Sequence, residues 1–216
     1  MFNIKKSLLF ILLLYFTINI VLFFPKNIFA QTVLFSDNFN DGFADGWTVM
    51  SGSSYLTVNN GRYGGVITPN FTIADSVAGS TSWSNYIYDI DMIALQGEDK
   101  NLLFRFQDSS HRYGFHISSG SLKIEKVTPT FAGDIAWAPI SFTNGTTYHM
   151  KVIANGSNIK IFQDGNEIID YTDTSDTAIL QGNIGIRVGT GAVAPSEVWF
   201  DNVVVTEIPE APPTPL

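Results

Sequence analysis

Hydrophobic and polar residues alternate with a period of two along most of the chain from Thr32 onward. The clearest runs, rich in Val, Ile, Phe and Tyr, span residues 85–93, 101–107, 111–117, 121–127, 147–154, 158–165, 182–189 and 197–205. This period predicts β-strands with one buried face, and no stretch shows the 3.6-residue period of an amphipathic helix. We therefore expect roughly a dozen strands and almost no helix.

Turn signals separate these runs. They are short stretches rich in Gly, Asn, Asp and Ser, namely DSSH, SSG, TNGT, ANGS, QDGN and VGTG. Many short strands at regular spacing, joined by such corners, are typical of an all-β antiparallel β-sandwich. The predicted fold is a jelly roll of two packed sheets.

Alternation also assigns a face to each side chain in residues 85–127. One face is apolar and predicts the core: Tyr86, Tyr88, Ile90, Met92, Leu102, Phe104, Phe106, Tyr113, Phe115, Ile117, Leu122 and Ile124. The opposite face is polar: Asp89, Asp91, Arg105, Gln107, Arg112, His116, Lys123 and Glu125. If these four strands are neighbours, one sheet has an apolar inner face and a charged outer face.

The polar face has two interpretations. One is a solvated surface, which is the ordinary role of charged side chains. The other is a shallow groove for sugars, which present hydroxyl edges and an apolar C–H face and so need polar groups beside an aromatic platform. The predicted carbohydrate-binding residues are Asp89, Asp91, Arg105, Gln107, His116, Trp83 and Trp137. Arg105 stands between two Phe residues and needs a partner, which Asp89 or Asp91 is placed to supply.

The two ends of the chain differ from this pattern. Residues 1–30 contain Lys5 and Lys6, a long apolar run and PKNIFA, which predicts a secretory signal peptide or, if it is not cleaved, an N-terminal membrane anchor. Residues 208–216 contain four prolines and predict an exposed tail or linker. The domain itself is expected to span residues 31–207 and to be secreted or held at the cell surface.

Charge and cysteine content narrow the choice of partners. Three of the 12 Lys and Arg residues precede Gln31 whereas all 20 Asp and Glu follow it, so residues 31–216 carry a formal charge of −11. Such a charge repels nucleic acid and suits neutral ligands or divalent cations. The chain has no Cys, which excludes disulfides, thiolate metal sites and a Cys nucleophile. We expect a monomeric domain whose partner is a carbohydrate or an extracellular polysaccharide.

No catalytic set is evident. The chain lacks G-x-S-x-G, H-E-x-x-H, a P-loop and G-x-G-x-x-G. Retaining β-glucanases with a lectin-like fold carry E-x-D-x-x-E on one strand, with two carboxylates about 5–5.5 Å apart. Asp89 and Asp91 match its first two acidic positions, but Ala94 occupies the third. We therefore name no catalytic residue.

The loop DNFNDGFADGW, Asp37 to Trp47, raises the question of a metal. It fails the EF-hand pattern, because Phe39 and Thr48 stand at ligand positions. Calcium needs six to eight oxygens, which distant strands also provide. Because the first and last strands of a jelly roll often pair, we expect Asp37 to meet Asp201 at a structural calcium site. The predicted calcium ligands are Asp37, Asp201, Asn40 and Asp41.

Several short motifs occur in a consistent order between residues 33 and 206: FSDNF, DGW, WSNY, LFRF, RYGF, YHMKV, IFQDG and WFDNVVV. In this order the chain resembles bacterial members of the concanavalin A-like lectin/glucanase superfamily. It is most similar to laminin-G-like jelly rolls and to 3-keto-disaccharide hydrolase-like domains. The resemblance implies a sugar site on a concave sheet, with Arg105 facing the groove, and a calcium ion near the chain ends at Asp37 and Asp201.

Three functions remain open from the sequence. The first is a secreted, non-catalytic carbohydrate-binding module with a structural calcium ion. The second is a glycoside-processing enzyme of the keto-sugar type, with Asp89 or Asp91 as base. The third is a structural or adhesive domain of a cell-surface protein, in which the polar face is only solvated.

Overall fold

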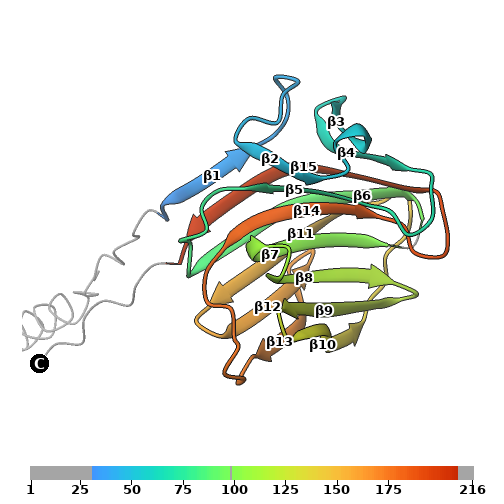
Figure 1. Cartoon of the computed structure of the whole chain (residues 1–216). Coiled ribbons are helices and arrows are strands. Elements are labelled where there is room, and N and C mark those ends of the chain that lie inside the picture. The colour runs from blue at the N-terminus through green and yellow to red at the C-terminus, as the bar shows by residue number, and fades with distance from the viewer. Residues whose placement is uncertain (1–30, 98, 209–216) are drawn as a thin grey trace, which may run out of the picture. The chain divides into compact units, whose positions relative to one another are not determined.

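The computed structural model describes residues 31–97 and 99–208 (Figure 1). Their regular structure is β apart from one short 3-10 helix, Ser53–Tyr55. They form 15 strands in two antiparallel sheets, which confirms the predicted β-sandwich and exceeds the expected dozen strands. Residues 1–30 and 209–216 lie outside this description, so their predicted roles stay predictions.

The eight-stranded sheet brings the two ends of the domain together. Its order is β13-β12-β11-β6-β15-β4-β3, and β1 pairs with β15, so the first and last strands are neighbours as expected. Its strands are β1 Val33–Asp37, β3 Leu56–Asn59, β4 Arg62–Ile67, β6 Tyr86–Gln96, β11 Thr147–Asn155, β12 Asn158–Gln163, β13 Asn166–Thr172 and β15 Ser196–Glu207.

The seven-stranded sheet has the order β10-β9-β8-β7-β14-β5-β2. Its strands are β2 Trp47–Ser51, β5 Ile73–Ala78, β7 Lys100–Asp108, β8 His111–Ser118, β9 Ser121–Thr128, β10 Phe131–Pro139 and β14 Asn183–Gly189. Figure 1 shows the two sheets as stacked layers. Because β6 belongs to one sheet and β7 to the other, the predicted polar face is divided between two opposite surfaces.

The inner faces of the sheets form one apolar core, which contains the predicted core residues except Phe106. Phe106 instead packs with Leu103 and Val77 in a separate small cluster. The cause is a break in the alternation of β7: its pairing with β8 shifts register after Phe104, and Arg105 adopts a positive φ of 48°. This irregularity turns Arg105 inward and Phe106 outward. Among the described residues, no helix is long and apolar enough to cross a membrane.

Candidate functional site

A row of cross-strand neighbours crosses the outer face of the seven-stranded sheet. The pairing register joins Trp137 to Lys123, Lys123 to His116, His116 to Asn101, Asn101 to Arg187 and Arg187 to Asp75. Residues paired in this way point to the same face, and neighbouring strands are about 4.8 Å apart, so the row spans roughly 24 Å. We call these six residues the outer row: Trp137, Lys123, His116, Asn101, Arg187 and Asp75.

Exposure changes along the outer row. The Trp137 side chain at the β10 edge is open to solvent, with 70% of the residue exposed. Asn101 and Asp75, nearer the other end, are only 9% and 6% exposed, although they belong to the outer row. The row thus combines a free aromatic ring at one edge with closely packed polar groups further along.

Charged groups around the outer row are paired. Arg187 binds Asp75 through two parallel contacts, Nε to Oδ1 at 2.7 Å and Nη2 to Oδ2 at 2.8 Å. Glu125 Oε2 accepts a hydrogen bond from Arg112 and lies 3.9 Å from Arg187 Nη1. Burial alone lowers the pKa of Arg187, but the hydrogen bond and charge of Asp75, with Glu125, raise it, so this guanidinium stays charged. The four side chains therefore form one fixed network with no net charge.

Beside the outer row, Gly114 and Gly185 lie on either side of Leu103 in the pairing register. The register places Gly114 beside Glu125, and Gly185 between Leu103 and Val77. A Cβ at Gly114 would lie 2.9 Å from the Leu102 carbonyl oxygen, and one at Gly185 would lie 2.8 Å from the Ser76 carbonyl oxygen. These contacts are too close for a larger residue, so the close packing around Leu103 requires glycine at both positions.

His116 and Lys123 keep polar atoms at the open side of the row. Lys123 Nζ lies 3.2 Å from Asp134 Oδ2, and His116 Nε2 lies 3.9 Å from Asp134 Oδ1. Both side chains are partly exposed. Together with Trp137 they offer hydrogen-bonding groups and a flat apolar ring to a ligand lying across β8, β9 and β10.

Only two of the seven predicted carbohydrate-binding residues, His116 and Trp137, lie in the outer row. Trp83 precedes β6 and packs edge-on against Tyr86, with ring centroids 6.3 Å apart. Gln107, at the end of β7, donates a hydrogen bond to the Gln181 carbonyl. The structure thus does not assemble the predicted set as one site.

Arg105 does not face a groove, which corrects the prediction for this residue. Its side chain is fully buried, at 0% exposure. It donates to the Ile179 carbonyl at 2.8 Å and to the Ser84 carbonyl at 3.0 Å, and burial lowers its pKa. Asp89 and Asp91 do not supply its partner because they lie on the other sheet. Arg105 therefore holds neighbouring chain segments together.

Asp89 and Asp91 bind a histidine on the outer face of the eight-stranded sheet. His149 Nε2 lies 2.9 Å from Asp89 Oδ1, and His149 Nδ1 lies 2.9 Å from Asp91 Oδ1. Lys151 contacts Asp89, and the Asn202 amide donates to Asp91. Burial lowers the pKa of His149, but the two carboxylates outweigh burial and raise it. Both acids are therefore engaged in a contact between β6 and β11.

This contact predicts a pH-dependent stability. Because the folded-state pKa of His149 lies above its ordinary value, its stabilising contribution is present below about pH 6.5 and is lost as the pH rises through the folded-state pKa. Melting temperatures measured from pH 5.5 to 8.5 should fall with rising pH in the wild type and fall less in His149→Gln. Equal slopes for the two proteins would contradict this role.

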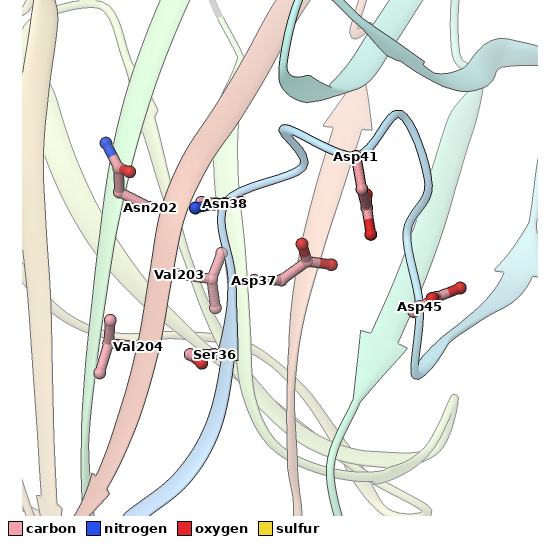
Figure 2. Close-up of a pocket in the computed structure, with 8 residues that line it drawn as sticks. All are labelled: Ser36, Asp37, Asn38, Asp41, Asp45, Asn202, Val203 and Val204. Atoms are coloured by element: carbon pink, nitrogen blue, oxygen red, sulfur yellow. The ribbon is translucent and has the colours of Figure 1, made fainter.

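The predicted calcium ligands are only partly brought together. Asp37, Asp41 and the unpredicted Asp45 line a pocket of about 470 Å³ that Asn40 and Asp201 do not line. Figure 2 shows the Asp37 and Asp41 carboxylates turned toward the same space, with Asp45 pointing away. Among the described residues, no three His, Asp or Glu side chains are arranged to hold a metal.

Asp37 has protein partners in place of a metal. Its Oδ1 accepts a hydrogen bond from the Phe39 backbone at 2.9 Å, and its Oδ2 accepts one from the Trp47 indole at 3.0 Å. Trp47 in turn packs on buried Phe39, with ring centroids 6.0 Å apart. The donor chemistry here suits calcium, but the arrangement of the side chains does not fit the expected site.

A chelator experiment tests this result. Because the Asp37 loop is held by Trp47 and Phe39, we expect EDTA and added calcium to leave the melting temperature unchanged. A ligand present at a hundred times its dissociation constant adds about 2.7 kcal/mol, so a calcium site would be visible in thermal unfolding. A midpoint several degrees higher with calcium would show that these side chains rearrange around the ion.

Sequence reasoning missed three residues of the outer row. Asn101, Arg187 and Asp75 received no role, and Arg187 and Asp75 are 112 positions apart in the chain. The available signal was the single Arg on the alternating run GNIGIRVG. Its partner, Asp75, lies on β5, and the sequence of β5 is not among the runs with clear alternation.

Comparisons with known proteins extend this description. The family model of 3-keto-alpha-glucoside-1,2-lyase-like domains matches residues 34–206. No curated protein sequence matches the chain. Among solved structures, the carbohydrate-binding module CBM66 from Bacillus subtilis is 23% identical with a TM-score of 0.61, and the match covers 75% of this chain and 96% of that one.

Two further solved structures share the fold. A Bacillus subtilis protein of unknown function with a galectin-like fold is 13% identical with a TM-score of 0.62, covering 82% of this chain and 98% of that one. The exoplasmic/lumenal domain of VIP36, bound to Ca²⁺ and Man3GlcNAc, is 11% identical with a TM-score of 0.64, covering 85% of this chain and 92% of that one. At these identities the likeness establishes the fold alone.

Proposed function

The chain belongs to the family of 3-keto-alpha-glucoside-1,2-lyase-like domains, and from this membership and the outer row we propose that it binds carbohydrate as a non-catalytic module. One observation carries the proposal: the outer row places an exposed indole in register with charged and amide side chains across six strands. Sugars need this combination, because their C–H faces pack on aromatic rings while their hydroxyls bind polar groups.

The charged network that includes Arg187 and Asp75 of the outer row favours a sugar-binding face over a merely solvated surface. Asp75, Arg187, Glu125 and Arg112 are fixed by their mutual contacts, so they bind a ligand with little further loss of side-chain entropy. The network has no net charge, which favours a neutral polyhydroxylated ligand. The fold neighbours include a carbohydrate-binding module and the VIP36 domain solved with Man3GlcNAc, which agrees with this proposal.

A catalytic role at Asp89 and Asp91 has less support. Both carboxylates contact His149, and they lie on the sheet opposite the outer row. A base for a keto-sugar reaction would have to reach the sugar bound on the outer row. We further propose that binding takes place outside the cell, because residues 1–30 read as an export signal or anchor.

Replacing Trp137 with Ala tests the proposal. Trp137 is exposed, so the change should leave folding intact while removing the aromatic platform. We expect affinity for the best ligand in a panel of neutral polysaccharides and oligosaccharides to fall about tenfold, measured by isothermal titration calorimetry.

Phe43→Ala is the matched control, because Phe43 is similarly exposed, at 65%, but lies in the loop after β1. This control should bind as the wild type does. Equal affinity of Trp137→Ala and wild type would reject the outer row as the site. If the purified protein releases product from a 3-keto-disaccharide, the chain is an enzyme and the proposal of a non-catalytic module is wrong.

A further inference from the structure

A second pocket, of about 590 Å³, opens where β7 and β9 end and β8 begins, and none of its lining residues belongs to the outer row. Its volume lies in the ordinary range for small-molecule sites. The lining residues are Gln107, His111, Thr128, Pro129, Thr130, Thr177, Ala178, Ile179, Leu180 and Gln181. Half of them come from the segment between β13 and β14, residues 173–182, which we call the strap.

Polar side chains of the seven-stranded sheet, of which Arg105 and Tyr113 are buried, hold the strap in place. The Ile179 amide donates to the Tyr113 hydroxyl at 3.1 Å, and the Ile179 carbonyl accepts from Arg105 at 2.8 Å. Gln107 donates to the Gln181 carbonyl at 3.1 Å. The backbone of the pocket wall is therefore fixed at Ile179 and at Gln181 by side chains of the sheet.

The start of the strap is fixed by a buried ion pair. Lys126 Nζ lies 2.7 Å from Asp173 Oδ2, and both side chains are less than 5% exposed. The same ammonium donates to Ser175 Oγ at 2.7 Å and to Thr177 Oγ1 at 3.0 Å. Since a strap ordered in this way loses little further entropy on binding, the pocket is preorganised for a ligand.

The lining defines the chemistry of that ligand. Pro129, Ala178, Ile179 and Leu180 supply apolar surface, and Leu180 is 51% exposed although the residues on both sides of it are held by hydrogen bonds. Hydroxyl and amide groups of Thr130, Thr177 and Gln107 stand around it, with the His111 ring. Among the residues that the structure describes, no Asp, Glu, Lys or Arg lines the pocket, in a domain with a strongly negative formal charge.

We propose that the strap pocket is a second ligand site, which binds one neutral ring bearing hydroxyls on its edge and an apolar face, as in a monosaccharide unit. The apolar wall packs on the face of the ring, and the Thr and Gln groups bind its edge. This site goes beyond the outer row and does not depend on it. It also gives Arg105 and Lys126 a shared role as positioning residues, which fix the strap without touching the ligand.

Amide chemical-shift mapping tests the site. The isotope-labelled protein is titrated separately with the methyl glycosides of glucose, galactose, mannose and fructose. At least one sugar should shift the amides of Thr177–Gln181 together with those of Thr128 and Thr130. Leu180→Ala should raise the dissociation constant for that sugar about tenfold, and Trp137→Ala should leave it unchanged.

Leu95→Ala is the matched control: it makes the same change at an exposed Leu, 41% exposed, that does not line the strap pocket. Shifts confined to the outer row, or no strap shifts with any of the four sugars up to their solubility limits, would overturn the second site. Strap shifts with cyclohexanol but with none of the sugars would also overturn it, in favour of an apolar partner.

Discussion

Asp173→Asn should lower the free energy of unfolding by about 3–5 kcal/mol, the usual effect of breaking a buried ion pair from one side. The Lys126 ammonium would then stay buried among Tyr113, Ser175 and Thr177 with no carboxylate to balance its charge. Chemical denaturation should show the loss as a lower midpoint at an unchanged slope.

Asp170→Asn is the matched control. Asp170 also pairs with a lysine, Lys160, at 2.6 Å, but its side chain is 44% exposed. Solvent screens a surface pair of this kind and leaves it only a small contribution to stability, so this variant should unfold close to the wild type. Similar losses for Asp170→Asn and Asp173→Asn would contradict the anchoring role of the buried pair.

The same pair predicts acid sensitivity. Burial raises the pKa of Asp173, but hydrogen bonds from Lys126, Tyr113 and Ser175 outweigh burial and lower it well below its ordinary value. A carboxyl with a lowered folded-state pKa stabilises the fold above its unfolded pKa, about 3.9, and loses that contribution as the pH falls. The wild type should therefore lose stability steeply below about pH 4, and Asp173→Asn should lose less there.

The fold was predictable because it depends on alternation, which the sequence records strand by strand. Ile90, Phe115 and Ile124 are buried as expected, since each follows a period of two within an unbroken strand. The prediction fails at Phe106 because one residue, Arg105, takes a left-handed conformation inside β7 and reverses the faces after it. A local break of this kind is set by packing against the strap and leaves no signal in the alternation.

The site was less predictable because it depends on which strands are neighbours. Consecutive hairpins place His116 beside Lys123, and these belong to adjacent runs in the sequence. The other half of the outer row requires β14 to insert between β7 and β5, which joins Arg187 to Asn101 and Asp75. Such a topology follows from the packing of the whole sandwich, and no sequence motif near Arg187 predicts it.

At the ends of the domain, too, the strand pairing was predictable and the side-chain contacts were not. The pairing of β1 with β15 was expected and is observed, with Asp37 opposite Val203. The chemistry at that junction was not predictable, because it depends on the Trp47 indole reaching Asp37 across the loop. The expected meeting of Asp37 with Asp201, together with the family resemblance, predicted calcium, whereas the hydrogen bonds of Asp37 favour a clasp within the loop.

Arg105→Ala should destabilise the protein by about 3–5 kcal/mol while leaving sugar binding on the outer row unchanged. The substitution leaves a cavity where a fully buried side chain stood, and it removes the donors of the Ile179 and Ser84 carbonyls. Arg105→Met keeps much of the volume and removes a buried charge, so it should cost less than Ala.

Measuring both the stability and the sugar affinity of Arg105→Met distinguishes two roles for this residue, fixing the strap or contacting the sugar. If Arg105 only fixes the strap, calorimetry with the best polysaccharide ligand should give the wild-type affinity, and denaturation should give a lower midpoint. An unchanged denaturation midpoint with a lower affinity for the polysaccharide would show that Arg105 belongs to the sugar site, as predicted from the sequence. The buried geometry favours the first result, because a ligand on the outer face has no path to a guanidinium that lies between the sheet and the strap.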